Sequence, residues 1–391
     1  MGGVALKDLS KRFVCLFLAG WIVLLSLCIA LTLATAKREE HPYYAQMQAA
    51  TDLAARAMEK VKTYKEENGI PLSADDRLKT GMLGGGDWTP ITTTDGELAA
   101  KRTSCNPDWA AVFVSYFYRA GVQKGDSVGM VFSGSFPALN VCALAAAQVC
   151  GLQTCVMASA GASYYGANDP DFTFFDMAQV LFSSGVLAGK IDYFSFGGGN
   201  DTGRDFKDED YMDFDGTAST RTAEEIRAAI RSRAETSDTV FLLEEDFEKN
   251  IENRIALFAE KSPDMKLFIS VGGSLVALGT GTDVFLDTGY LSPSRFGFGR
   301  TDALGVRAKG SGLLDYFRRR GVPVVSMLNI RSQAREHSLP VDPDEPFVTG
   351  QGEIYFSKAY SPVFPLLALV ASAAAIVVFF ILRRRKKNRS L

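Results

Sequence analysis

Two long apolar runs lie near the ends of this 391-residue chain. Residues 13–36 and residues 362–382 carry no charged side chain, and each run is long enough to cross a bilayer as a helix. Basic residues flank both runs on their outer sides, in the tails 1–12 and 383–391. By the positive-inside rule we expect two transmembrane helices, a cytoplasmic tail at each end, and an extracytoplasmic segment between them.

The first apolar run ends in Ala34-Thr35-Ala36, which has the A-x-A form of a signal-peptidase site. The run is long for a signal peptide, so an uncleaved anchor is preferred over a cleaved leader. In both cases the second run would anchor the same segment on the same side of the cytoplasmic membrane.

The segment between the runs alternates between two hydrophobic periods. Apolar residues at helical spacing predict a helix over residues 43–70, within a stalk (37–80) that also packs on the domain. From residue 81 to 336, short apolar runs that end in Gly- or Ser-rich turns alternate with helical segments. Strand–helix–strand succession of this kind builds parallel sheets through right-handed crossovers. We therefore predict a Rossmann-like, three-layer α/β domain with a mostly parallel sheet, followed by a Pro-rich surface strap over residues 337–361.

Charge and residue counts exclude several classes of function. The formal net charge is −3, the basic tails contribute +2 and +6, and the segment between the runs is therefore near −11. No basic face is then expected, which argues against nucleic acid as a partner. With two histidines in the chain, a multi-histidine metal site is excluded and a histidine-based hydrolase is disfavoured. We expect no metal and no cofactor. Of the four cysteines between the runs, we expect three or four to be plain buried thiols, and a bond from Cys142 or Cys150 to Cys155 is the alternative.

The turn Ser133-Gly134-Ser135 is the first candidate site. It follows an apolar run and precedes an Ala-rich helix in which Pro137 fits the first position. Backbone N–H groups, the helix dipole and two hydroxyls would bind a carboxylate or phosphate there. The alternative is that Ser135 only caps the helix. The turn matches neither a Walker motif, nor G-x-G-x-x-G, nor the G-x-S-x-G elbow.

Three further stretches carry polar residues after predicted strands or beside cations: residues 157–177, the glycine-rich residues 195–206 with Arg204, and residues 99–109 with Lys101. The small residues of 157–177 would let a backbone approach a ligand, although Asp169-Pro170 also fits a plain helix entry. Lys101 and Ser104 are three residues apart, so they are surface residues, contacts to an anion together with Arg102, or a Ser–Lys dyad. Catalytic residues remain unassigned, and the expected anion-binding residues are Lys101, Arg102, Ser104, Ser133, Gly134, Ser135, Ser163, Asn168 and Arg204.

Several long strings resemble one known family. "TPITTTDGELAAKRTSCNPDWAAVFV", "GDSVGMVFSGSFPALNVCALAAA", "SAGASYYGANDPDFTFFDM" and "FSFGGGNDTGRDF" are similar to the poly-gamma-glutamate system proteins over most of the domain. The resemblance implies an accessory role in poly-γ-glutamate synthesis and export, beside an ATP-dependent ligase and membrane subunits. It implies no catalytic residues.

Three functions follow as expectations. The first is an anchored accessory protein whose domain binds the anionic polymer, a small carboxylate, or the synthase and export subunits. The alternative is an enzyme that cleaves or transfers γ-glutamyl bonds, using Ser135, the Lys101 and Ser104 pair, or a metal held by aspartates. A sensor that signals through the apolar helices is a third, more remote expectation.

Overall fold

The computed structural model describes residues 2–85, 88–208, 211–212, 218–219, 221–280, 287–293 and 310–388; for residues 2–17, 211–212, 218–219, 379 and 382–388 it describes the backbone only. The chain divides into two units. One consists of Met1–His41 with Phe356–Leu391, and the other is Pro42–Tyr355.

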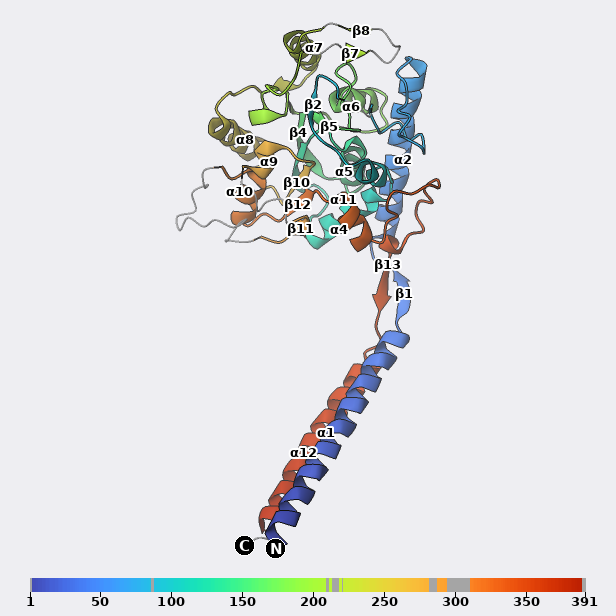
Figure 1. Ribbon diagram of the computed structural model, residues 1–391, viewed down its shortest axis with the longest axis vertical. Coiled ribbons are helices and arrows are strands. Elements are labelled where there is room, and N and C mark those ends of the chain that lie inside the picture. The colour runs from blue at the N-terminus through green and yellow to red at the C-terminus, as the bar shows by residue number, and fades with distance from the viewer. Residues whose placement is uncertain are drawn as a thin grey trace. The chain divides into compact units, whose positions relative to one another are not determined.

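The first unit joins the two ends of the chain. Strands β1 and β13 pair in antiparallel register, with Lys37 opposite Ala359. The helices that contain the apolar runs lie side by side (Figure 1), and Trp21 Nε1 donates to Ser372 Oγ at 3.1 Å. Within the described part of the chain, none of the helices combines the length and the apolar character that crossing a bilayer requires. The elements of this unit are α1 (Gly2–Ala34), β1 (Lys37–Glu40), β13 (Phe356–Ala359) and α12 (Val363–Asn388).

The second unit is built on a seven-stranded sheet of order β11-β12-β10-β3-β4-β6-β9. Every pairing in it is parallel except that of β11 with β12. The chain moves outward from β3 through β4 and β6 to β9, and then returns to β10 on the other side of β3. The predicted α/β class with a mostly parallel sheet is confirmed. The strands are β3 (Ser127–Phe132), β4 (Gln153–Ser159), β6 (Tyr193–Ser195), β9 (Val240–Phe241), β10 (Leu267–Val271), β11 (Gly289–Leu291) and β12 (Val324–Met327).

Helices cover both faces of this sheet. Figure 1 shows α2 and α5 to one side of the strands and α8 and α10 to the other. Neighbouring residues of β3 divide between the faces, as the pleat of a strand requires. The ring of Phe132 meets Phe174 edge to face at 5.8 Å, whereas Val131 belongs to the core formed with Phe258 and Phe317. The covering helices are α2 (Tyr44–Glu67), α4 (Trp109–Arg119), α5 (Pro137–Val149), α6 (Phe174–Ser183), α8 (Phe247–Lys261) and α10 (Leu313–Arg319).

A second, small sheet lies beside the loop that follows β4. Strands β2 and β5 form a small parallel sheet in which Thr94 pairs with Ser163. This pairing brings the segment before α3 against the loop that follows β4. The remaining elements are β2 (Thr92–Thr94), α3 (Leu98–Ser104), β5 (Ala162–Ser163), η1 (Gly199–Asp201), β7 (Tyr211–Met212), β8 (Ala218–Ser219), α7 (Ala223–Glu235), α9 (Leu275–Leu278), α11 (Ile330–Glu336) and η3 (Glu353–Tyr355).

The predicted helix of the stalk and the predicted strap both pack against this unit. The helix predicted over residues 43–70 is α2, and it packs on α4 and α5 through buried side chains such as Met47 and Val61. The segment expected as a surface strap is tied down near its end, since the buried Tyr355 hydroxyl donates to Asp108 Oδ1 at 2.6 Å. Among the described cysteines, Cys28, Cys105, Cys142, Cys150 and Cys155 are free thiols.

Candidate functional site

A cavity of about 670 Å³ opens at the carboxyl ends of the parallel strands. Its wall includes residues at or just after the carboxyl ends of five strands, namely Ser133, Ser159, Gly197, Gly273 and Leu328. The cavity thus spans the point between β3 and β10 where the strand order reverses, which is where open α/β sheets bind ligands. Its volume lies within the range of about 300–1,000 Å³ that is usual for small-molecule sites.

The Ser-Gly-Ser turn is fixed by neighbouring backbone. Ser133 Oγ donates to the carbonyl of Val271 at 3.2 Å and accepts from Ser135 N at 3.3 Å. Gly272 follows β10 with φ of 84°, and a Cβ at this position would overlap the Ser133 hydroxyl. Glycine is therefore required where the β10 loop passes this turn.

Ser135 does not cap α5. The N-cap position is taken by Phe136, which makes no side-chain capping bond, and Pro137 stands at the start of the helix. Ser135 Oγ instead accepts from the backbone N–H of Ser163 at 3.1 Å. The hydroxyl therefore fixes β5 against the turn, and the capping interpretation of Ser135 is wrong for this structure.

Lys101 lies in the wall of the cavity and is 1% exposed. Its ammonium donates to Ser163 Oγ at 2.7 Å and to the carbonyl of Ser135, and lies 4.2 Å from the centre of the Phe136 ring. Among the described residues, no carboxylate forms an ion pair with it. Burial lowers the pKa of Lys101 from its ordinary value of 10.5 to about 7. Charged and neutral forms are therefore both populated near neutral pH.

Further charged groups surround the cavity. Arg331 and Arg335 reach it from α11, and Asp95 and Glu97 reach it from the segment between β2 and α3. Arg331 forms an ion pair with Glu97, while its buried Nε has no hydrogen-bond partner. Within the part of the chain that the structure describes, no ion pair involves Arg335. The cavity therefore presents cationic donors that are available to an anion.

A buried ion pair supports the opposite wall. Asp201 lines the cavity and forms a salt bridge with Arg254, and both side chains are 4% exposed. Burial raises the pKa of the Asp201 carboxyl, and the Arg254 guanidinium opposes that shift. Arg254 also donates to Asn250 Oδ1. This pair is internally compensated, so Asp201 adds little free negative charge to the cavity.

Of the expected anion-binding residues, Lys101, Ser133, Ser135 and Ser163 lie in the wall of this one cavity. Gly134 belongs to the turn between two of them, and its N–H donates to the carbonyl of Gly161 at 3.2 Å. Ser159, also in the wall, is the last residue of β4. The tertiary structure thus brings three separate sequence stretches to one place.

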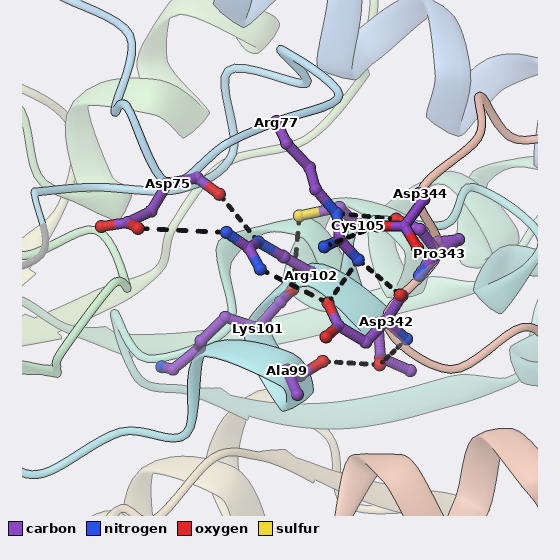
Figure 2. A network of polar contacts seen from close by, with 10 residues as sticks. Asp75, Arg77, Ala99, Lys101, Arg102, Cys105, Asp342, Pro343 and Asp344 are labelled. Atoms are coloured by element: carbon purple, nitrogen blue, oxygen red, sulfur yellow. Dashed lines mark hydrogen bonds and ion pairs between the residues drawn. The ribbon is translucent and has the colours of Figure 1, made fainter.

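Arg102 points elsewhere and does not line the cavity. Its Nε donates to the carbonyl of Asp75 at 2.8 Å, and its guanidinium lies 3.7 Å from Asp342 Oδ1. Figure 2 shows Arg102 and Arg77 converging on Asp342, while the Lys101 side chain extends away from them. Arg102 thus stabilises the strap and is not placed to contact an anion in the cavity, contrary to the expectation.

Three other expected residues also lie outside the cavity wall. Ser104 Oγ donates to the carbonyl of Lys101 at 2.6 Å within α3, so the Lys101 and Ser104 dyad does not form. Buried Asn168 donates to Thr92 Oγ1 at 3.2 Å and so supports β2. Arg204 is exposed and donates to Asn200 Oδ1 at 3.0 Å.

Other sequence expectations concern residues away from the cavity. The helix entry expected at Asp169-Pro170 is displaced, because α6 begins after Thr173, which forms a capping box with Asp176. His337 contacts the Tyr116 hydroxyl at 2.7 Å, and neither residue lines the cavity. A hydrolase centred on His337 therefore has no support from this geometry.

Sequence reasoning missed Arg331 and Arg335. The sequence contained a signal for them. Ligand sites in open α/β sheets lie just beyond the carboxyl ends of the parallel strands, and β12 is one of these strands. Residues 328–335 come directly after β12 and line the cavity at several positions. Asp95 and Glu97 lie before α3 and had no comparable signal.

The chain matches no protein-family model, no curated protein and no solved structure in the comparisons made with known proteins. The chemistry of the site therefore rests on its own residues.

Proposed function

We propose that this chain is a membrane-anchored accessory protein of poly-γ-glutamate synthesis or export, whose α/β domain binds carboxylate groups of the polymer in the cavity. One observation carries the proposal. The cavity contains two cations, Lys101 in its wall and Arg335 from α11, that form no ion pair with any described carboxylate.

The cost of burying charge explains why such a site favours an anion. An ammonium that is 1% exposed is strongly destabilised unless a negative group approaches it. A bound carboxylate would supply that charge and accept a charge-assisted hydrogen bond. Arg335 and the free Nε of Arg331 would contact the same ligand or the next carboxylate along a chain. Repeated carboxylates are the chemistry that distinguishes polyglutamate.

The membrane location is part of the proposal. Apolar side chains are exposed along α1, among them Ile22 and Val23, and along α12, among them Leu369 and Val370. Apolar surface of this extent on paired helices favours contact with lipid or with membrane subunits. The basic tails favour cytoplasmic ends, with residues 37–361 on the outer side of the cytoplasmic membrane.

Calorimetric titration of the full chain with L-glutamate, γ-glutamylglutamate and polyglutamate at pH 6 tests the cavity. We expect Lys101→Met to weaken binding by about tenfold or more and Arg335→Gln by several-fold, because each removes a cation from the ligand. Arg231→Gln is the matched control, since it makes the same charge change on an arginine that is outside the cavity and 51% exposed. Equal affinity for all four proteins would refute the site.

Membrane attachment and partners need a separate test. We expect the full chain to remain with membranes after alkaline extraction, and to co-purify with the synthase and export subunits when these are expressed together. Recovery in the supernatant without partners would contradict this part of the proposal and leave the cavity unaffected.

An enzyme that cleaves γ-glutamyl bonds is the alternative that the sequence leaves open. It would require a nucleophile and a base in this same cavity.

A further inference from the structure

We propose that Ser163 and Lys101 form a catalytic Ser–Lys dyad that hydrolyses amide bonds, with Ser163 Oγ as nucleophile and Lys101 Nζ as general base. The inference deepens the proposed function, because it takes the substrate to be a carboxylate-bearing γ-glutamyl amide bound in the same cavity. The bond at 2.7 Å between these two atoms is the geometry from which it starts.

The other serines of the cavity are less suited to act as the nucleophile. Ser133 Oγ donates to the carbonyl of Val271, and Ser159 Oγ donates to that of Phe132. Ser135 Oγ is the acceptor for the N–H of Ser163. Of these four serines, Ser163 is the one whose hydroxyl contacts a side chain that can take its proton, Lys101. Ser135 is therefore a positioning residue.

Lys101 is arranged to accept that proton. Its second hydrogen bond goes to the carbonyl of Ser135, which fixes the direction of the amine. An amine with one N–H on this carbonyl keeps its lone pair available to the Ser163 hydroxyl. Burial among uncharged groups favours the neutral form, and the lowered pKa of about 7 is consistent with a base that works near neutral pH.

The reaction balances with water as the only co-reactant. Ser163 Oγ forms a bond to the carbonyl carbon of the amide while its proton passes to Lys101 Nζ. The C–N bond then breaks, and the leaving amine takes that proton from Lys101. Water attacks the resulting Ser163 ester, giving its own proton to Lys101, and Ser163 Oγ recovers the proton as the carboxylic acid departs.

The start of α5 adds electrostatic support. Phe136, the N-cap residue, lines the cavity beside Lys101. The partial positive charge at the N-terminus of this 13-residue helix favours the oxyanion that forms on the attacked carbonyl. Arg331 and Arg335 would hold the carboxylate of the acyl group.

Two measurements on the purified full-length chain test the dyad. Treatment with a fluorophosphonate, followed by mass spectrometry, should give one adduct on Ser163. Release of p-nitroaniline from γ-glutamyl-p-nitroanilide should fall roughly 100-fold or more in Ser163→Ala and in Lys101→Met. Ser115→Ala is the matched control, because Ser115 Oγ donates to a carbonyl within α4, outside the cavity.

Calorimetry with L-glutamate on the same proteins separates the two proposals. Ser163→Ala should lose the adduct and the turnover while its far-UV circular dichroism spectrum matches that of the wild type, which shows that it is folded, and Ser115→Ala should bind glutamate like the wild type. Glutamate binding by the wild type with no Ser163 adduct, or with turnover that Ser163→Ala retains, would overturn the dyad alone. Absence of glutamate binding, with Ser163-dependent turnover, would overturn the polymer-binding proposal and leave the dyad standing.

Discussion

Lys101 Nζ lies 2.7 Å from Ser163 Oγ, although the two residues are 62 positions apart in the chain. Lys101 belongs to α3 and Ser163 to β5, and the small sheet of β2 with β5 brings the two elements together. A buried amine held against a hydroxyl, in a cavity at the carboxyl edge of a parallel sheet, has consequences that can be measured.

Carboxylate binding should weaken as pH rises through 7. The free site has a Lys101 pKa of about 7, so the fraction of ammonium falls from most of the molecules at pH 6 to a small part at pH 8. We expect the affinity for L-glutamate to drop about tenfold across this range. Titration calorimetry at both pH values measures it, with Lys101→Met showing little change.

Amide turnover should move in the opposite direction. The neutral amine is the base, so kcat/KM for γ-glutamyl-p-nitroanilide should rise with pH through about 7. A turnover profile that falls together with glutamate affinity would assign Lys101 to binding only.

Lys101 should also make stability depend on pH. Its pKa is about 7 when folded and returns to its ordinary 10.5 when unfolded. Between these values the unfolded chain holds a proton that the folded chain lacks, so the free energy of unfolding rises with pH. We expect Lys101→Met to be more stable than the wild type at pH 6, by on the order of 2 kcal/mol, and to lose that advantage towards pH 10. Urea denaturation at both pH values tests this, and a constant difference would contradict it.

Two adjacent glycines should respond differently to alanine. Gly272 has φ of 84°, and an added Cβ would overlap Ser133 Oγ, whereas a Cβ on Gly273 would meet no atom within 4 Å. We expect Gly272→Ala to cost about 2–4 kcal/mol of unfolding free energy and Gly273→Ala less than about 1 kcal/mol. Denaturation of the matched pair checks the close approach of the β10 loop to the Ser-Gly-Ser turn. Similar losses in both variants would argue against it.

Arg102 should matter for stability and not for binding. It contacts Asp75 and Asp342 (Figure 2), and none of these three residues lines the cavity. We expect Arg102→Gln to lower the free energy of unfolding by about 1 kcal/mol, with glutamate affinity unchanged within twofold. Thermal unfolding and calorimetry on one preparation measure both. A tenfold loss of glutamate affinity in a variant that remains stable would show that Arg102 contributes to binding.

Local patterns in the sequence were sufficient to predict the α/β class and the mostly parallel sheet. Short apolar runs that end in small residues predicted strands of the parallel sheet. Apolar residues at helical spacing predicted α2. Pro137 marked the start of α5 because its fixed φ and missing N–H suit the first turn of a helix. These properties act over a few residues, so they can be read without knowledge of the fold.

The composition of the site could be predicted only in part. Serines after β3 and β4 were found because the carboxyl ends of parallel strands meet at one edge. Arg331 and Arg335 lie in the same cavity and were missed, although they follow β12 at that same edge. In the sheet, β12 lies two positions from β3, which brings the residues after both strands to one cavity. No short stretch of the sequence predicts this strand order.

The sequence by itself determined the class of fold, the apolar ends, and the serines and Lys101 as candidates. Only the tertiary structure decided that Lys101 meets Ser163 and not Ser104, and that Arg102 faces the strap. Adjacent residues on a helix point about 100° apart, so Lys101 and Arg102 could not share a target. Which of them would be buried against the serines depended on β2 pairing with β5, a contact between segments that are distant in the chain.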